Sequence, residues 1–297
     1  MAGIAVARNQ LRTQDMRSSP PDEPRIAFDL AGVSKTLLMP LWARALESQR
    51  SDALLRDPKA VAIVEHLDFD FDQFRHKSID KLGFIIRASL IDRFVREYLA
   101  QRPDGTVVEL GVGLDTRLDR LDNGRAHWFE VDLPECADLR QKIVGSHPRR
   151  RLIAESLLGD GWRDALAAGN PAPPLFVCEG VFYFLPEPEL KSLFGDLAQR
   201  FPGSRIVFDC QSPLMMAVNN LRHPLSDSRM QWSLRSAKDI EGWAPGLKVE
   251  RVVGWGDRPD FDAFRSRLSR FSLGARALLP PIRNLFRIIC VQLGGAS

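Results

Sequence analysis

The hydrophobic rhythm of the chain changes near residue 103. Before this point apolar residues recur every three or four positions, the period of an amphipathic helix, and they predict helices over residues 34–50, 57–67 and about 78–100. After it, short apolar runs alternate with helical stretches. These runs predict strands at residues 106–110, 127–132, 150–157, 174–180, 204–211, 247–255 and 284–293.

Strands that are joined by helices favour an α/β fold with a mostly parallel sheet, right-handed crossovers and helices on both faces. Connecting helices are predicted at 134–144, where Pro134 takes the favoured first position, and at 187–201. The chain is therefore expected to divide into a loose tail over 1–24, a helical segment over 25–103, and an α/β domain over 104–297 with an insertion around 213–243.

One cation breaks the apolar pattern of the third helix. Arg87 lies four residues after Gly83 and four before Ile91, so it shares a row that is otherwise apolar, whereas the polar face holds Asp92 and its neighbours. A buried guanidinium needs an anionic partner. Arg87 therefore meets an anionic ligand, pairs with a core carboxylate of the chain, or extends its charged end to the edge of the helix, and the pattern alone leaves these alternatives open.

The loop after the first strand is the strongest candidate for a ligand site. Gly111 and Gly113 allow close approach of ligand atoms to the backbone, and ligands collect beyond the carboxyl ends of parallel strands. Asp132 ends the second strand 19 residues after Gly113, an offset at which a carboxylate can accept both hydroxyls of a ribose. The alternative is a tight turn in which Asp132 caps the helix at Pro134.

The residues after the glycines discriminate between nucleotides. A dinucleotide turn carries a third glycine where this chain has Thr116, and Asp115 precedes it at the start of the next helix. A carboxylate there would repel a phosphate. We therefore expect a nucleoside without a phosphate, and S-adenosylmethionine is the common cofactor of that description.

The motifs "VVELGVGLDTR", "FEVDLPE" and the upstream "RDPKA" together resemble the leucine carboxyl methyltransferase superfamily. The segment "VSKTLLMPLWARALESQR" resembles its polyketide O-methyltransferase branch, the type found in tetracenomycin biosynthesis, and the resemblance extends from about Val33 to the C-terminus. It implies a class I, Rossmann-like methyltransferase with a mostly parallel seven-stranded sheet and a helical N-terminal cap.

The resemblance also implies roles for individual residues. Arg87 matches the position that holds the methionine carboxylate, Asp132 matches the ribose-binding carboxylate, and Glu179 in "CEGVFYF" matches a cofactor-site glutamate. The remaining matched positions flank the same loops: Glu109, Gly111, Gly113, Leu133, Ser156 and Leu157. Ser156-Leu157 departs from the Asp-Leu pair of protein-directed members, although a serine hydroxyl can still meet the adenine edge.

The expected acceptor is a small molecule, a carboxylate or phenol of a polyketide-like or aromatic secondary metabolite. Met and Leu residues of the 213–243 insertion suit an apolar pocket, although packing of an inserted helix explains them equally well. Tyr183 and His223 are acceptor-side candidates, but a core tyrosine and a surface histidine are the commoner cases. The sequence offers no clear general base and no metal-ligand cluster.

Composition narrows the function classes further. The chain is 44% hydrophobic and 27% charged with a net charge of +3, and its basic residues form no block that would suit nucleic acid. No apolar run approaches a membrane span and no secretory signal is evident, so the cytoplasm is the expected location. The well-separated cysteines predict buried free thiols: Cys136, Cys178, Cys210 and Cys290.

Two other functions fit the sequence less well. A nicotinamide-dependent oxidoreductase with a degenerate turn fits poorly, because Thr116 replaces the third glycine and no hydride-site triad is evident. A noncatalytic binding protein of the same fold has no need of charged residues at Arg87, Asp132 and Glu179. The sequence does not define the oligomeric state.

Overall fold

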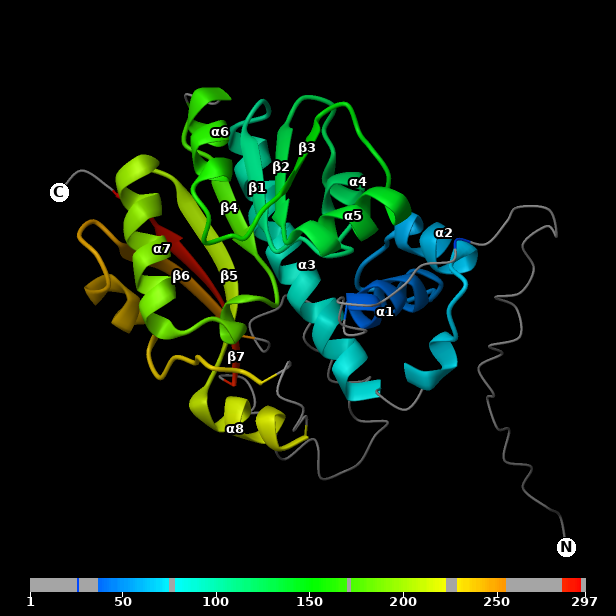
Figure 1. Ribbon diagram of the computed structural model, residues 1–297. Helices are drawn as coiled ribbons and strands as arrows, with labels where there is room; N and C mark the ends of the chain where they lie inside the picture. Colours follow the sequence, from blue (N-terminus) through cyan, green and yellow to red (C-terminus); the bar gives the residue numbers. More distant parts are fainter. Residues whose placement is uncertain are drawn as a thin grey trace, which may run out of the picture.

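A computed structural model describes residue 26 and residues 37–74, 78–169, 172–222, 229–254 and 285–294 of the 297-residue chain. The predicted tail over residues 1–24 lies outside this range, and so does His223. The described residues form one seven-stranded sheet with helices packed on both faces (Figure 1).

The sheet has the strand order β3-β2-β1-β4-β5-β7-β6, and β7 runs antiparallel to both of its neighbours while the other pairs are parallel. Each predicted strand is present: β1 Thr106–Leu110, β2 His127–Asp132, β3 Arg150–Ala154, β4 Leu175–Cys178, β5 Arg205–Gln211, β6 Lys248–Gly254 and β7 Phe286–Gln292. Central strands β1 and β4 are buried along their whole length, which explains why their sequences read as unbroken apolar runs.

Helices α6 (Gly161–Gly169) and α7 (Glu187–Arg200) cover one face of the sheet (Figure 1). Their side chains Trp162 and Phe194 pack in one cluster with Phe176 and Phe208 of the central strands. Trp162 and Phe176 meet edge to face with ring centroids 6.2 Å apart, a favoured geometry for aromatic pairs. This cluster is the larger part of the core.

Helices α3 (Ser78–Gln101) and α4 (Arg117–Leu121) cover the other face. The apolar rows predicted for α3 are buried there against Val107, Trp128 and Val207 of the sheet. Asp92 was wrongly placed on the polar face of this helix. It is completely buried, because α4 packs over α3 at that position and supplies cationic partners for the carboxylate.

The N-terminal helices form a separate cluster beside the sheet. Helices α1 (Leu38–Ser48) and α2 (Pro58–His66) and the 3₁₀ turn η3 (Phe71–Phe74) pack against α5 (Pro134–Ile143) and against Leu114. Asp57 begins α2 by accepting the Ala60 N–H at 2.9 Å, with Pro58 at the first helical position. The N-terminal helices therefore adjoin the loop that follows β1.

Two of the three remaining elements extend the carboxyl edge of the sheet, and the third leads into the edge strand β6. The 3₁₀ turn η4 (Phe182–Phe184) follows β4, helix α8 (Pro213–Arg222) follows β5, and η6 (Ala237–Gly242) precedes β6. The strand order reverses between β1 and β4, so the loops after these two strands flank the crevice where ligands bind in open parallel sheets. None of the described helices is long and apolar enough to cross a membrane.

Candidate active site

The loop after β1 owes its conformation to two glycines. Gly111 and Gly113 have φ angles of +67° and +51°, a region that disfavours side chains. A Cβ atom at Gly111 would lie 2.5 Å from a methyl carbon of Val181, which places the loops after β1 and β4 in contact. The predicted turn is thus present at the switch point of the sheet.

Asp132 is bonded to this turn. One carboxylate oxygen accepts the Gly113 N–H at 2.6 Å and the other accepts the Leu133 N–H at 2.8 Å. Burial raises the pKa of Asp132, while these two N–H groups oppose the rise. The N-cap of α5 is Leu133, without a side-chain cap, so Asp132 does not serve as the cap of that helix.

Arg140 of α5 holds the glycine turn through hydrogen bonds to its carbonyl groups. Its guanidinium donates to both oxygens of the buried Glu130 at 2.6 Å, and its Nη1 donates to the carbonyls of Gly113 at 3.0 Å and Asp115 at 2.6 Å. Bidentate pairing of this kind fixes the guanidinium plane. The carbonyls of the turn are therefore held by a rigid buried group.

Two arginines of α4 organise a buried ionic cluster under the same turn. Arg117 donates to Asp92 and Glu109, and Arg120 donates to Asp92 and Asp115. Burial alone would raise the pKa of Asp115, but the arginines outweigh it and hold that pKa well below its usual range. The prediction that Asp115 repels a phosphate treated this carboxylate as an unpaired charge, and that premise is wrong, because Arg117 and Arg120 balance its charge.

Glu109 lies inside this cluster at the end of β1. Only 2% of it is exposed; one carboxylate oxygen accepts from Arg117, whereas Oε2 is buried without a hydrogen-bond partner among the described residues. Burial, opposed by Arg117 and reinforced by Asp115, raises the pKa of Glu109 to about 7. Glu109 thus belongs to the buried ionic cluster that lies under the turn.

The inward row of α3 brings Arg87 to the loop after β4. Its Nε donates to Glu179 at 2.9 Å, and its Nη1 donates to the hydroxyl of Tyr183 at 3.2 Å and to Asp209 at 3.3 Å. The second carboxylate oxygen of Glu179 accepts from Arg117. Arg87 has the anionic partners that its position required, and Glu179 connects it to the cluster under the turn.

Asp209 was not identified from the sequence. It is 6% exposed, lies on β5, and accepts the Gly180 N–H at 2.7 Å as well as Arg87. Burial, together with Glu179, raises its pKa to about 6 against the opposing effect of Arg87. The available signal was an acidic residue in the apolar run "RIVFDCQ", since a charge in a central strand needs a partner.

The loop after β3 carries Ser156 and Leu157. The Glu155 N–H donates to the Asp132 carbonyl at 2.8 Å, so this loop lies next to Asp132. The Ser156 hydroxyl accepts the Leu158 N–H at 3.2 Å, and the Leu157 carbonyl accepts from the Trp162 indole at 3.1 Å. Both residues are half-buried, whereas Leu133 beside Asp132 is 46% exposed.

Tyr183 is 3% exposed, so it is a core side chain, and its hydroxyl accepts from Nη1 of Arg87; its role on the acceptor side stays a prediction. The other acceptor-side candidate, His223, lies outside the described residues. The cysteines are free as predicted, and Cys178, Cys210 and Cys290 are buried, but Cys136 is only half-buried. Within the described part of the chain, no group of acidic, histidine and cysteine side chains could hold a metal ion.

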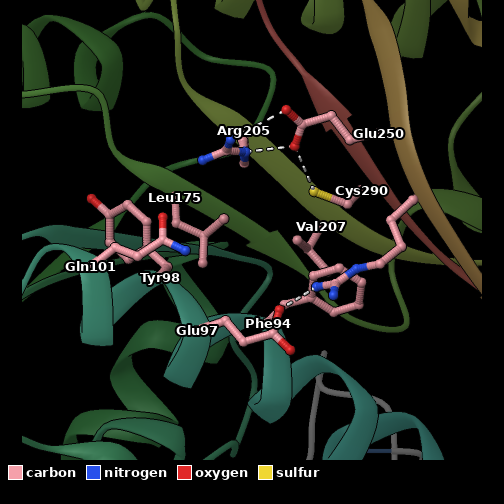
Figure 2. A pocket seen from close by; sticks show the side chains of 10 residues that line it. Phe94, Glu97, Tyr98, Gln101, Leu175, Arg205, Val207, Glu250 and Cys290 are labelled. Carbon is pink, nitrogen blue, oxygen red and sulfur yellow. Dashed lines mark hydrogen bonds and ion pairs between the residues drawn. The ribbon is translucent and has the colours of Figure 1, made fainter.

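A separate cavity of about 250 Å³ lies at the opposite end of the sheet, between α3 and strands β4 to β7 (Figure 2). Leu175 and Arg205 at its floor begin their strands, whereas the residues described above follow the strand ends. Its charged groups are paired with each other: Arg205 meets Glu250 and Arg251 meets Glu97, each at 2.6 Å. This cavity does not belong to the candidate site.

The carboxyl edge of the sheet can hold a nucleoside that carries an amino acid. Each oxygen of Asp132 bonds one backbone N–H and keeps acceptor capacity for a ribose hydroxyl. The Nη2 group of Arg87 donates no hydrogen bond within the described part of the chain, so its N–H groups can donate to the carboxylate of a ligand. The two glycines give the turn the positive φ angles that shape it around Asp132, and they let Val181 and Leu37 pack directly against its backbone. These features fit S-adenosylmethionine.

The comparisons with known proteins agree with this assignment. The pattern of the family described as leucine carboxyl methyltransferase matches residues 37–198. The tetracenomycin polyketide synthesis O-methyltransferase TcmP of Streptomyces glaucescens is 27% identical over 88% of this chain and 96% of its own. A putative S-adenosyl-L-methionine-dependent methyltransferase of Streptomyces coelicolor, SCO7813, is 32% identical over 86% of this chain and 96% of its own.

Among solved structures, the magnesium protoporphyrin IX methyltransferase ChlM from Synechocystis aligns with a TM-score of 0.45 and 13% identity, over 79% of this chain and 92% of that one. The family match excludes both the nicotinamide-dependent oxidoreductase and the noncatalytic binding protein. The chain belongs to the leucine carboxyl methyltransferase family and is an S-adenosylmethionine-dependent methyltransferase.

Proposed function

We propose that this methyltransferase acts on an oxygen of a small-molecule acceptor, a carboxylate or phenol of a polyketide-like or aromatic metabolite. The observation that carries the cofactor placement is the arrangement at the switch point, where Asp132 is bonded to the glycine turn and Arg87 keeps one donor edge unused. The acceptor class rests on similarity to TcmP, whose name describes it as a polyketide synthesis O-methyltransferase.

Three charged residues would hold the cofactor. Asp132 would accept the ribose hydroxyls, Nη2 of Arg87 would donate to the methionine carboxylate, and Glu179 would both accept from the amino group and fix Arg87. Such charge-assisted hydrogen bonds are worth roughly 1.5–3 kcal/mol each. Ser156 and Leu157, in the loop next to Asp132, would meet the adenine edge, and Leu133 would flank the ribose.

S-adenosylmethionine supplies, when bound, a methyl group on a sulfonium. An oxygen nucleophile can attack this methyl carbon in line with the carbon–sulfur bond, and the sulfur then leaves as the thioether of S-adenosylhomocysteine. The protein's main task is to align the acceptor, and alignment alone can contribute an effective molarity of about 10⁵–10⁸ M. A carboxylate acceptor is already ionised at neutral pH, whereas a phenol has an unperturbed pKa near 10. The carboxylates at the crevice, Asp132 and Glu179, already accept from backbone N–H groups and arginines and are assigned to the cofactor, so a carboxylate or an acidic phenol, which needs no general base, fits better than a simple phenol.

Exposed apolar side chains at the carboxyl edge support a hydrophobic acceptor. Leu214, Val218 and Leu221 recur on one face of α8 and are 65%, 40% and 84% exposed, and Phe184 of η4 is 36% exposed. The segment after α8 is anchored to η4, since the Gln231 N–H donates to the Tyr183 carbonyl at 2.6 Å. We infer that the 213–243 insertion and the helical cap over 25–103 border the acceptor site.

The proposal is tested by incubating the protein with S-adenosylmethionine labelled at the methyl group and a panel of hydroxylated aromatic carboxylic acids and phenols. Mass spectrometry of the products would identify the methylated atom. We expect a methyl ester or an aryl methyl ether. Methyl found only on nitrogen, or only on the C-terminal carboxylate of proteins, would reject the proposed acceptor class.

A further inference from the structure

Asp209 lies where β5 passes the end of β4. In the register of these strands Cys178 pairs with Phe208, so Asp209 stands level with Glu179 and Gly180, the first residues after β4. On its other side β7 presents the apolar Ile288. A carboxylate buried at this place, with 6% of it exposed, is stable only if its oxygens find donors.

Each oxygen of Asp209 has a different donor. Oδ1 accepts the Gly180 N–H at 2.7 Å, and Oδ2 accepts Nη1 of Arg87 at 3.3 Å. Gly180 has a φ of +78°, and a Cβ atom there would lie 2.9 Å from Nη2 of Arg87. The guanidinium therefore lies directly against the backbone of the turn that Asp209 holds.

The three groups around Arg87 leave one edge of its guanidinium unused. Glu179 takes the Nε hydrogen, and Tyr183 and Asp209 take the Nη1 hydrogens, so the Nη2 edge alone has no acceptor among the described residues. Glu179 is shared with Arg117, whereas neither oxygen of Asp209 bonds a second arginine. Asp209 is thus the carboxylate whose interactions are confined to Arg87 and the turn beside it.

We propose that Asp209 is a positioning residue, which orients Arg87 so that its Nη2 edge faces the carboxylate of the cofactor. The proposal rests on the proposed function, because it takes Arg87 as the carboxylate-binding group. Asp209 acts through Arg87 and Gly180 and touches no reacting atom.

Two ligands separate positioning from a general structural role. S-adenosylhomocysteine carries the amino-acid carboxylate, whereas 5′-methylthioadenosine has the same nucleoside and thioether without it. We expect Asp209→Asn, measured by calorimetry, to weaken S-adenosylhomocysteine about 10-fold, the equivalent of one misplaced charge-assisted bond, and to change 5′-methylthioadenosine less than about twofold. Equal weakening of both ligands would show a structural role only and overturn the proposal.

An unchanged or tighter affinity for S-adenosylhomocysteine would also overturn it, because Asp209 would then compete for Arg87 rather than orient it. If Asp209→Asn does not fold, Asp209→Glu offers the same test, since it keeps the charge but shifts the carboxylate away from the place where it meets Nη1 of Arg87 and the Gly180 N–H. Glu250→Gln, in the ion pair at the opposite end of the sheet, is the control and should bind both ligands as the unmodified protein does.

Failure of the proposed function is distinguishable from failure of this inference. If Arg87→Ala leaves the preference for S-adenosylhomocysteine over 5′-methylthioadenosine intact, Arg87 does not hold the carboxylate and the cofactor placement itself is wrong. If Arg87→Ala abolishes the preference and Asp209→Asn does not reduce it, the cofactor placement stands and only the role of Asp209 falls.

A pH profile gives a second readout. Because Asp209 has a pKa of about 6, its protonation should reduce the preference for S-adenosylhomocysteine as the pH falls below about 6, and Asp209→Asn should remove this dependence. The ionisable groups that interact with Asp209 come from α3, β4 and the residue after it, η4, and its own strand: Arg87, Cys178, Glu179, Tyr183 and Cys210. If the preference for S-adenosylhomocysteine depends on pH in the same way in the unmodified protein and in Asp209→Asn, another of these groups causes the dependence, and this readout contradicts the role of Asp209.

Discussion

Asp132→Asn is the substitution that tests the ribose contact most sharply. The change keeps the volume of the side chain but removes its charge and one of its two acceptor oxygens. In the folded protein those oxygens already accept the N–H groups of Gly113 at 2.6 Å and Leu133 at 2.8 Å, so the new amide NH₂ group would face one of these donors. The turn would then lose one bond as well as the ribose contact.

The magnitude follows from the number of bonds affected. Two charge-assisted bonds to ribose hydroxyls become at most one neutral bond, a loss of about 3 kcal/mol, which corresponds to about 150-fold in Kd. Calorimetry should show this weakening for S-adenosylhomocysteine and for 5′-methylthioadenosine alike, because both carry the ribose. Asp138→Asn, the same change at an exposed position of α5, should leave both affinities unchanged. An affinity of Asp132→Asn within about twofold of the unmodified protein would refute the ribose assignment.

Three further predictions concern the ionic cluster and the acceptor. The pKa of Glu109 is raised to about 7, so the folded state binds this proton more tightly than the unfolded state, and the stability contributed by Glu109 falls as the pH rises from about 4.5 to 7. The free energy of unfolding of Glu109→Gln, measured with urea, should therefore rise relative to that of the unmodified protein by on the order of 1–3 kcal/mol between pH 5 and pH 8. If the difference in stability between the two proteins is the same at both pH values, the titration of Glu109 is not its cause. Arg140→Met should lower the free energy of unfolding by about 2–4 kcal/mol, because the buried Glu130 loses two charge-assisted bonds and keeps only the one from Arg150 at 2.9 Å, and a loss below about 1 kcal/mol would show that the pair with Arg140 is not needed. Methyl transfer to a carboxylate acceptor should be nearly independent of pH between about 6 and 9, whereas a phenol would give a rate that rises with pH, so the profile identifies the acceptor type.

The sheet could be predicted because its signals are local. The strands and the turn between them appear as apolar runs and glycines a few residues apart, and the offset from Gly113 to Asp132 follows from one strand–helix–strand unit. The inward position of Arg87 was visible for the same reason, since one helix sets the row. Helical periodicity also predicts which residues face the sheet.

The ionic partners could not be predicted, because they come from distant parts of the chain. Asp92 and Arg117 are separated by 25 residues, and Arg87 and Asp209 by 122. Periodicity assigned Asp92 to a polar face whose other members, such as Arg93 and Arg96, are indeed exposed, but α4 packs over the helix at Asp92 and buries that one carboxylate. Asp115 was interpreted as a lone charge although Arg117 and Arg120 follow it closely in the sequence, because only the fold of α4 shows that both guanidinium groups turn toward Asp115.

The most direct test of the cofactor placement is a crystal structure of the protein with S-adenosylhomocysteine. We predict that both ribose hydroxyls lie within about 3.2 Å of the Asp132 carboxylate and that the amino-acid carboxylate lies within the same distance of Nη2 of Arg87. A ligand bound instead in the cavity between α3 and the amino ends of β4 and β5, or one whose carboxylate points away from Arg87, would contradict this placement.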